Sequence, residues 1–96
     1  MKLVHITVHF EFADIIAQIL DRCGVETYIR HGMVEGKDSE GKHMGTQVFP
    51  GNLTVFNAHV PEDKLDPLFE DLRTFREEKT AHEHIQALVL PVERQL

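Results

Sequence analysis

The segment that decides the fold is residues 2–24, which read KLVHITVHFEFADIIAQILDRCG. Residues 2–10 alternate apolar and polar side chains, as a strand with one buried face does. From Glu11 the apolar spacing changes to that of a helix, and Gly24 stands where a left-handed C-terminal cap is expected. The apolar stripe of this helix is Phe12, Ile15, Ile16, Ile19, Leu20 and Cys23. The chain therefore begins with a strand followed directly by an amphipathic helix.

The remainder of the chain predicts three more strands and one more helix. We expect strands at residues 25–33, 53–60 and 85–92, and a helix from Pro61 to about Glu77, in which Pro67 either causes a kink or marks the first turn. Residues 34–50 contain three glycines and few large apolar residues, which predicts a long loop. This order predicts a single α+β domain over residues 1–96: a ferredoxin-like βαββαβ fold with both helices on one face of an antiparallel sheet.

The other face of this sheet has no predicted cover. On the first strand it carries Leu3, His5, Thr7 and His9. A domain of 96 residues buries only a modest core, so we expect this face to be buried against other subunits of a homo-oligomer.

The charge and the hydropathy of the chain argue against several classes of function. The net charge of −6 and the lack of a Lys/Arg run argue against nucleic acid as a partner. No apolar run is long enough to span a membrane, and residues 1–5 lack the features of a signal peptide, so we expect a cytoplasmic protein without direct membrane insertion. Cys23 is the single cysteine and falls on the apolar stripe of the helix, which favours a core position over a redox role.

Several of these features together resemble the PII signalling proteins and their wider superfamily. They are the Met-Lys start before a strand, the helix that closes on a glycine, the long loop between the second and third strands, the sequence Val60-Pro61-Glu62-Asp63, and the last strand with Val89-Leu90-Pro91-Val92-Glu93. The resemblance covers essentially the whole chain. It implies a homotrimer with the uncovered sheet face turned inward, and small effectors bound in clefts between subunits beside the base of the long loop, the T-loop.

The chain departs from this family at the segment that binds phosphates. Typical members carry Thr-Gly-x-x-Gly-Asp-Gly-Lys before the last strand, where glycine amides surround the phosphates. Residues 77–84 of this chain read EEKTAHEH instead, and residues 49–52 lack the basic residue that usually precedes the third strand. The loop also contains no tyrosine that could be uridylylated. We therefore do not expect the family's usual ATP or ADP binding.

Histidine and glutamate in place of glycine and lysine favour a divalent transition metal, Zn, Cu, Ni or Co, as the effector. His82 and His84 would point to the same side of an extended backbone. The family arrangement would bring His31 of a neighbouring subunit toward them, and binding would order the loop. The full set of candidate ligands is His31, His82, His84, Glu83, Glu35, and, in the loop, His43 and Met44. The alternatives to metal binding are that His82 and His84 are solvated side chains at a helix-to-strand junction, and that His43 and Met44 belong to a disordered loop tip.

The resemblance also implies a partner. Divergent PII-like proteins are often encoded beside transporters, so we expect a membrane transporter or another regulated protein to respond to the loop.

Two other functions remain open. A PII-like sensor of a small anion or a nucleotide would use the cations Arg30, Lys37 or Lys79. A small enzyme of the dimeric-barrel type would instead use the strand histidines as acid or base; these are His5, His9 and His59, which equally suit packing or hydrogen bonding within the fold.

Overall fold

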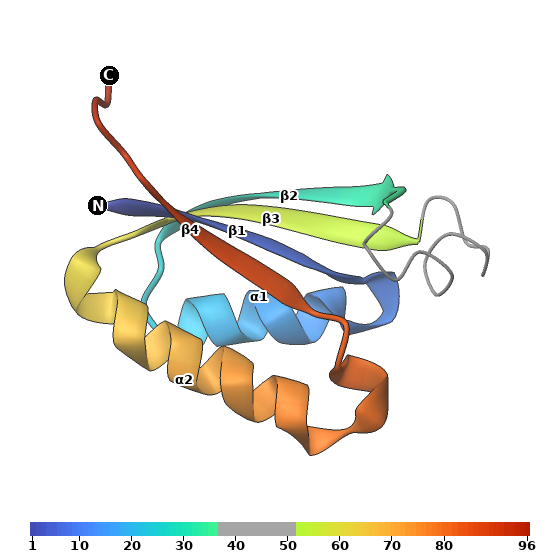
Figure 1. The fold of residues 1–96 in the computed structure, drawn as a ribbon. Coiled ribbons are helices and arrows are strands. Elements are labelled where there is room, and N and C mark those ends of the chain that lie inside the picture. Colours follow the sequence, from blue (N-terminus) through green and yellow to red (C-terminus); the bar gives the residue numbers. More distant parts are fainter. Residues whose placement is uncertain (37–51) are drawn as a thin grey trace.

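The computed structural model describes residues 1–36 and 52–96, which form one four-stranded sheet and two α-helices (Figure 1). The elements in chain order are β1 (Lys2–His9), a 3₁₀ turn (Phe10–Phe12), α1 (Ala13–Arg22), β2 (Thr27–Val34), β3 (Leu53–Val60), α2 (Glu62–Glu78), a second 3₁₀ turn (Thr80–His82) and β4 (Gln86–Pro91). The predicted βαββαβ order is confirmed.

The strands lie in the order β2-β3-β1-β4, and each neighbouring pair is antiparallel. The strand that begins the chain is therefore central, and β2 and β4 are the two edges. The end of β1 at His9 pairs with Leu53, where β3 begins, and Val34 at the end of β2 also pairs with Leu53. Gln86, the first residue of β4, pairs with Thr7. We call this end, marked by His9, Val34, Leu53 and Gln86, the loop end of the sheet.

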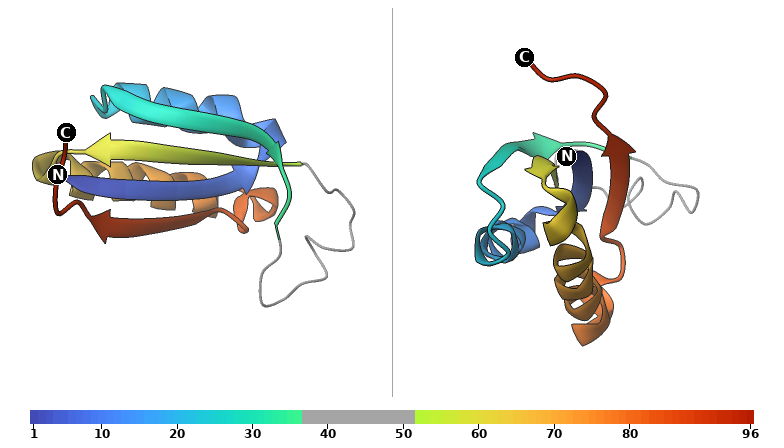
Figure 2. Two further views of the ribbon diagram at one scale, coloured as in Figure 1. Left: turned by 90° about the horizontal axis from the view of Figure 1, so that it is seen from above. Right: turned by 90° about the vertical axis from the view of Figure 1, so that its left-hand side faces the viewer.

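Both helices pack on the same face of the sheet, as predicted (Figure 2). The alternating apolar residues of β1 and β3 face them and are fully buried, with Phe56 as the largest. The core consists of Val4, Ile6, Val8, Ala13, Ile16, Ile19, Leu20, Val25, Phe56, Ala58, Val60, Leu68, Leu72 and Phe75. No α-helix in the described part of the chain is both long enough and apolar enough to cross a membrane.

The boundaries of several elements differ from those predicted. α1 begins at Ala13 rather than Glu11 because the chain first forms the 3₁₀ turn, which His9 caps by accepting a hydrogen bond from the Glu11 amide at Nδ1 (3.3 Å). Phe10 therefore leaves the strand and is 47% exposed. α2 begins at Glu62 and continues through Pro67, because the residues beyond it, such as Leu68, are buried against the sheet.

The end of β2 is irregular. Its pairing with β3 shifts between His31 and Val34, and Met33 within this bulge has a φ of +59°. This conformation is uncommon for a residue with a side chain. Pairing resumes at Val34, so β2 ends one residue past the predicted end at Met33, and it begins at Thr27 rather than Val25.

The second face of the sheet is open: among the described residues no helix covers it (Figure 2). Ile29 of β2 and Leu88 and Leu90 of β4 are 55%, 59% and 46% exposed. At its centre His5 donates from Nδ1 to Oδ1 of Asn57, its partner in the register, at 2.9 Å. The predicted uncovered face is therefore present, and it combines apolar side chains with an internally satisfied polar pair.

Gly24→Ala should lower the free energy of unfolding by about 1–2 kcal/mol, because a left-handed backbone is costly for alanine. Gly24 has a φ of +79°, and an added Cβ would lie 2.8 Å from Nζ of Lys64, which donates to the Gly24 carbonyl. Urea unfolding followed by far-UV circular dichroism measures the change. Gly32→Ala is the matched control, because a Cβ there meets nothing within 4 Å. Equal losses in both variants would contradict this explanation.

Candidate functional site

The candidate site residues within the described ranges lie on two separate parts of the fold. Arg30, His31 and Glu35 belong to β2 or directly follow it. The others belong to the segment of residues 79–85 between α2 and β4, which we call the pre-β4 segment; they are Lys79, His82, Glu83 and His84. The remaining candidates, Lys37, His43 and Met44, lie outside the described residues.

These two parts belong to opposite edges of the sheet. β3 and β1 lie between β2 and β4, so three strand spacings, about 14 Å, separate the edges. Seen from above, the regular parts of β2 and β4 run along the two sides of the sheet, and the chain at the end of β2 bends across the loop end (Figure 2). The regular part of β2, with Arg30 and His31, and the pre-β4 segment therefore belong to different edges of one chain.

His82 is part of the core. Its side chain is 4% exposed, its ring stacks on Phe75 (centroids 3.9 Å apart, planes at 7°), and the edge of Phe12 packs against it at 4.6 Å. Nδ1 of His82 donates to the carbonyl oxygen of Phe75 at 2.7 Å. The imidazole thus joins the end of α2 to the 3₁₀ turn that precedes α1.

The prediction that His82 and His84 share one side is wrong. Residues 80–82 form a 3₁₀ turn, in which the His82 amide donates to the Lys79 carbonyl (3.0 Å) and the Glu83 amide to that of Thr80 (3.1 Å). The alternation of an extended strand does not apply to such a turn. His82 points into the core, whereas His84 is exposed and its Nε2 lies 3.5 Å from Oε1 of Glu83. Lys79 is also exposed.

The two candidates on β2 face opposite sides. Arg30 lies on the helix side, where Nη1 donates to Oδ1 of Asp14 at 2.9 Å and the guanidinium lies 5.7 Å from the centre of the Phe56 ring. His31 is exposed and pairs in the register with Val55 of the open face. Glu35 is exposed just after the strand. Arg30 therefore already has an acidic partner on α1.

The fold has close counterparts among solved structures. No protein-family model matches the chain, and no curated protein matches it. CPII from Thiomonas intermedia, a nitrogen regulatory PII-like protein whose structure contains ADP, AMP and bicarbonate, is 30% identical over 97% of this chain and 88% of CPII, with a TM-score of 0.70. The chain belongs to the PII-like superfamily.

Other structures agree with this assignment. CPII bound to ADP, AMP and acetate is 26% identical and matches this PII-like chain with a TM-score of 0.73 over 93% of this chain and 82% of CPII. A PII-like protein from Thermus thermophilus has the same fold, with a TM-score of 0.64, 22% identity, and coverage of 92% of this chain and 80% of that one.

The ligands of CPII correct our prediction about the cofactor of this PII-like protein. They are adenine nucleotides together with bicarbonate or acetate, which overturns the expectation of Zn, Cu, Ni or Co in place of ATP or ADP. Within residues 1–36 and 52–96 no group of three His, Cys, Asp or Glu residues could hold a metal ion. The physical reason is clearest at His82, whose ring is enclosed by two phenylalanines and whose Nδ1 is bonded to a main-chain carbonyl.

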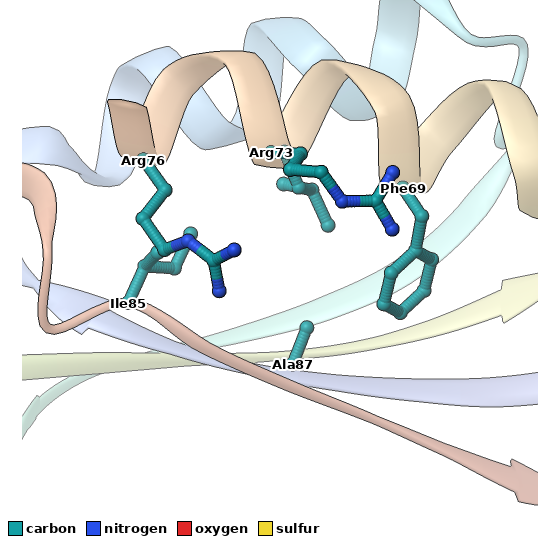
Figure 3. A pocket seen from close by; sticks show the side chains of 6 residues that line it. Phe69, Arg73, Arg76, Ile85 and Ala87 are labelled. Atoms are coloured by element: carbon teal, nitrogen blue, oxygen red, sulfur yellow. The ribbon is translucent and has the colours of Figure 1, made fainter. Parts of the chain in front are cut away.

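A pocket of about 220 Å³ lies between α2 and β4 and was not among the sites predicted from the sequence (Figure 3). Its lining residues are Phe69, Leu72, Arg73, Arg76, Ile85 and Ala87. Neither Arg73 nor Arg76 is among the candidate residues predicted from the sequence. Their spacing of three residues, beside the apolar stripe of α2, is the signal that indicates two cations on one side of the helix.

His82→Ala should lower the free energy of unfolding by about 2–4 kcal/mol, because it leaves a cavity between two aromatic rings and removes a buried hydrogen bond. His84→Ala is the matched control and should change it by less than about 0.5 kcal/mol, as exposed substitutions usually do. Urea unfolding of both variants provides the comparison. Equal stability of the two would mean that His82 does not anchor the pre-β4 segment.

Proposed function

We propose that this protein is a PII-like signalling subunit that binds an adenine nucleotide or a small anion in clefts between subunits and reports the bound ligand to a regulated partner protein. The observation that carries this proposal is the similarity to CPII over 97% of the chain, because the CPII structures contain ADP, AMP and bicarbonate. The segment between β2 and β3, with the candidates Lys37, His43 and Met44, is the proposed contact with the partner, a membrane transporter or another regulated protein.

The arrangement of the strands supports a site between subunits. A ring of identical subunits uses two different surfaces of each chain, so that one edge meets the other edge of the next copy. β2 and β4 are two such edges, and both reach the loop end. In such a ring the end of β2, with His31 and Glu35, comes near the pre-β4 segment of the next subunit, with Lys79 and His84.

The open face of the sheet supports an oligomer. Exposed apolar side chains lie on both edge strands of this face, Ile29 on β2 and Leu88 and Leu90 on β4, on either side of the His5–Asn57 pair. Exposed apolar side chains gathered on one face are typical of an interface. We propose that three copies bury these faces against one another, with the His5–Asn57 pair near the centre of each contact.

An enzyme of the dimeric-barrel type is the weaker alternative. Of the strand histidines proposed for it, His5 is bonded to Asn57 and His9 caps the turn at Glu11. Burial raises the pKa of the Cys23 thiol, and the hydrogen bond to Asp71 (3.3 Å) and the negative charge of that residue raise it further. A raised pKa leaves less of the nucleophilic thiolate at neutral pH, so Cys23 is a poor nucleophile. We therefore propose a non-enzymatic role.

Calorimetric titration of the oligomer with AMP, ADP, ATP and bicarbonate should detect saturable binding of at least one of them. Lys79→Ala should weaken it about tenfold, because a hydrogen bond to a charged group is lost. Lys2→Ala is the matched control, since Lys2 lies at the opposite end of β1 and should not alter binding. No binding of any of the four compounds, or equal binding by both variants, would contradict the proposed site.

Leu88→Glu should convert the trimer to monomers, because it places a charge in the apolar contact between open faces. Light scattering coupled to size-exclusion chromatography gives the mass. Ile15→Glu is the matched control: Ile15 is 42% exposed but lies on α1, away from the open face, so the trimer should persist. A wild-type protein that is monomeric, or a Leu88→Glu variant that stays trimeric, would contradict this interface.

A further inference from the structure

The pocket between α2 and β4 lies on the helix side of the β4 edge (Figure 3). Its floor is apolar: Phe69 and Leu72 come from α2, Ile85 is the last residue of the pre-β4 segment, and Ala87 lies at the start of β4. Ala87 contributes only a methyl group on the side of the sheet that faces the helices, where it pairs in register with the buried Ile6. The small side chain at this position leaves the space open.

Two arginines of α2 lie over this floor. In the close-up the guanidinium of Arg76 points down between Ile85 and Ala87, and that of Arg73 extends beside Phe69 (Figure 3). An apolar surface with two cations at its rim is complementary to a molecule that has an apolar body and a negative charge. Planar guanidinium groups bind a carboxylate through paired hydrogen bonds.

The two arginines differ in their existing partners. Nη1 of Arg73 lies 3.0 Å from Oε1 of Glu70, in an ion pair whose side chains are 52% and 71% exposed. Such exposed pairs contribute little, so a ligand that also gains apolar contacts can compete with Glu70 for Arg73. Within the described residues no hydrogen bond or ion pair engages Arg76. Arg76 is therefore the cation most available to a ligand.

We propose that this pocket binds a small organic carboxylate with a compact apolar body, such as a short branched aliphatic acid or an aromatic acid. At about 220 Å³ the space is smaller than the roughly 300–1,000 Å³ of most drug-sized ligand sites. The carboxylate accepts hydrogen bonds from Arg76 and, after displacement of Glu70, from Arg73. The apolar body rests on Phe69, Ile85 and Ala87.

This site goes beyond the nucleotide or anion cleft of the proposed function. That cleft is proposed to combine residues of two subunits, whereas α2 and the start of β4 already shape this pocket within a single chain. The two sites adjoin through the backbone: Ile85 at the pocket follows His84, and its amide donates to the His82 carbonyl at 3.3 Å. A ligand in the pocket therefore contacts Ile85, which directly follows the exposed His84 of the pre-β4 segment.

The test is titration of the intact oligomer with sodium isovalerate and sodium benzoate, by calorimetry and by amide chemical shifts. The neutral isosteres isovaleramide and benzamide are compared in the same way. The carboxylates should bind saturably, shift the amides of Ile85 and Ala87, and bind at least about tenfold more tightly than the amides, because they make charge-assisted hydrogen bonds.

Variants separate the parts of the site. Arg76→Gln should weaken carboxylate binding about tenfold, whereas Glu70→Gln should strengthen it by freeing Arg73. Ala87→Leu should abolish binding by filling the floor without changing any charge. Arg94→Gln, an exposed arginine beyond β4, is the matched control and should leave binding unchanged. Far-UV circular dichroism checks that each variant keeps its fold.

Three results would overturn the inference: no saturable binding of either acid, equal binding of acids and amides, or binding that Arg76→Gln and Ala87→Leu leave unchanged. In that case the arginines serve only to cover apolar surface with their stems. Competition by bicarbonate or AMP would also overturn it, because the acids would then occupy the cleft of the proposed function. If the wild-type protein binds the acids but no nucleotide or bicarbonate, the result would instead contradict the proposed function and not this inference.

Discussion

The ring of His82 determines how the chain passes from α2 to β4. It stacks on Phe75, packs against Phe12, and bonds to the Phe75 carbonyl, so a single side chain joins the end of one helix to the turn before the other. Because the ring is held inside, the residues on either side of it are turned outward. Glu83 and His84 reach the surface. Ile85 lies directly before β4, where it lines the pocket between α2 and β4.

The central position of β1 is the second constraint. Since β1 pairs with both β3 and β4, β2 and β4 are kept at opposite edges of the sheet. The cleft that we propose would combine these two edges from neighbouring subunits. A small domain with exposed apolar side chains on its open face gains buried surface when such a ring closes.

Periodicity in the sequence predicted the order of the elements. The alternation in residues 2–9 and most of the helical stripe in residues 12–23 arise from burial on one face, although Ile15 of that stripe is 42% exposed. Gly24 was placed correctly because few other residues adopt its backbone conformation. The end of β2 was less predictable: Gly32 indicates an interruption there, but the register shift between His31 and Val34 is a property of the pairing with β3.

The site was harder to predict for two reasons. His82 and His84 were read as neighbours on a strand, but local hydrogen bonds form a turn there, and two phenylalanines distant in sequence enclose one ring. The metal was predicted from histidine and glutamate in place of the glycine and lysine motif, but the loss of one way to hold a phosphate does not exclude another. Arg73 and Arg76 were not predicted as binding residues because the pocket beside them depends on Ala87, a small residue on β4.

The two edges of the sheet also bear on how this protein avoids uncontrolled association. Unpaired edge strands can recruit further strands and so begin aggregation. At one edge, the register shift and left-handed Met33 distort the end of β2, and at the other β4 ends at Pro91, which has no amide hydrogen to donate. Each edge therefore has only a short regular stretch with which another strand could pair. This limits the growth of extended sheets before newly made chains assemble.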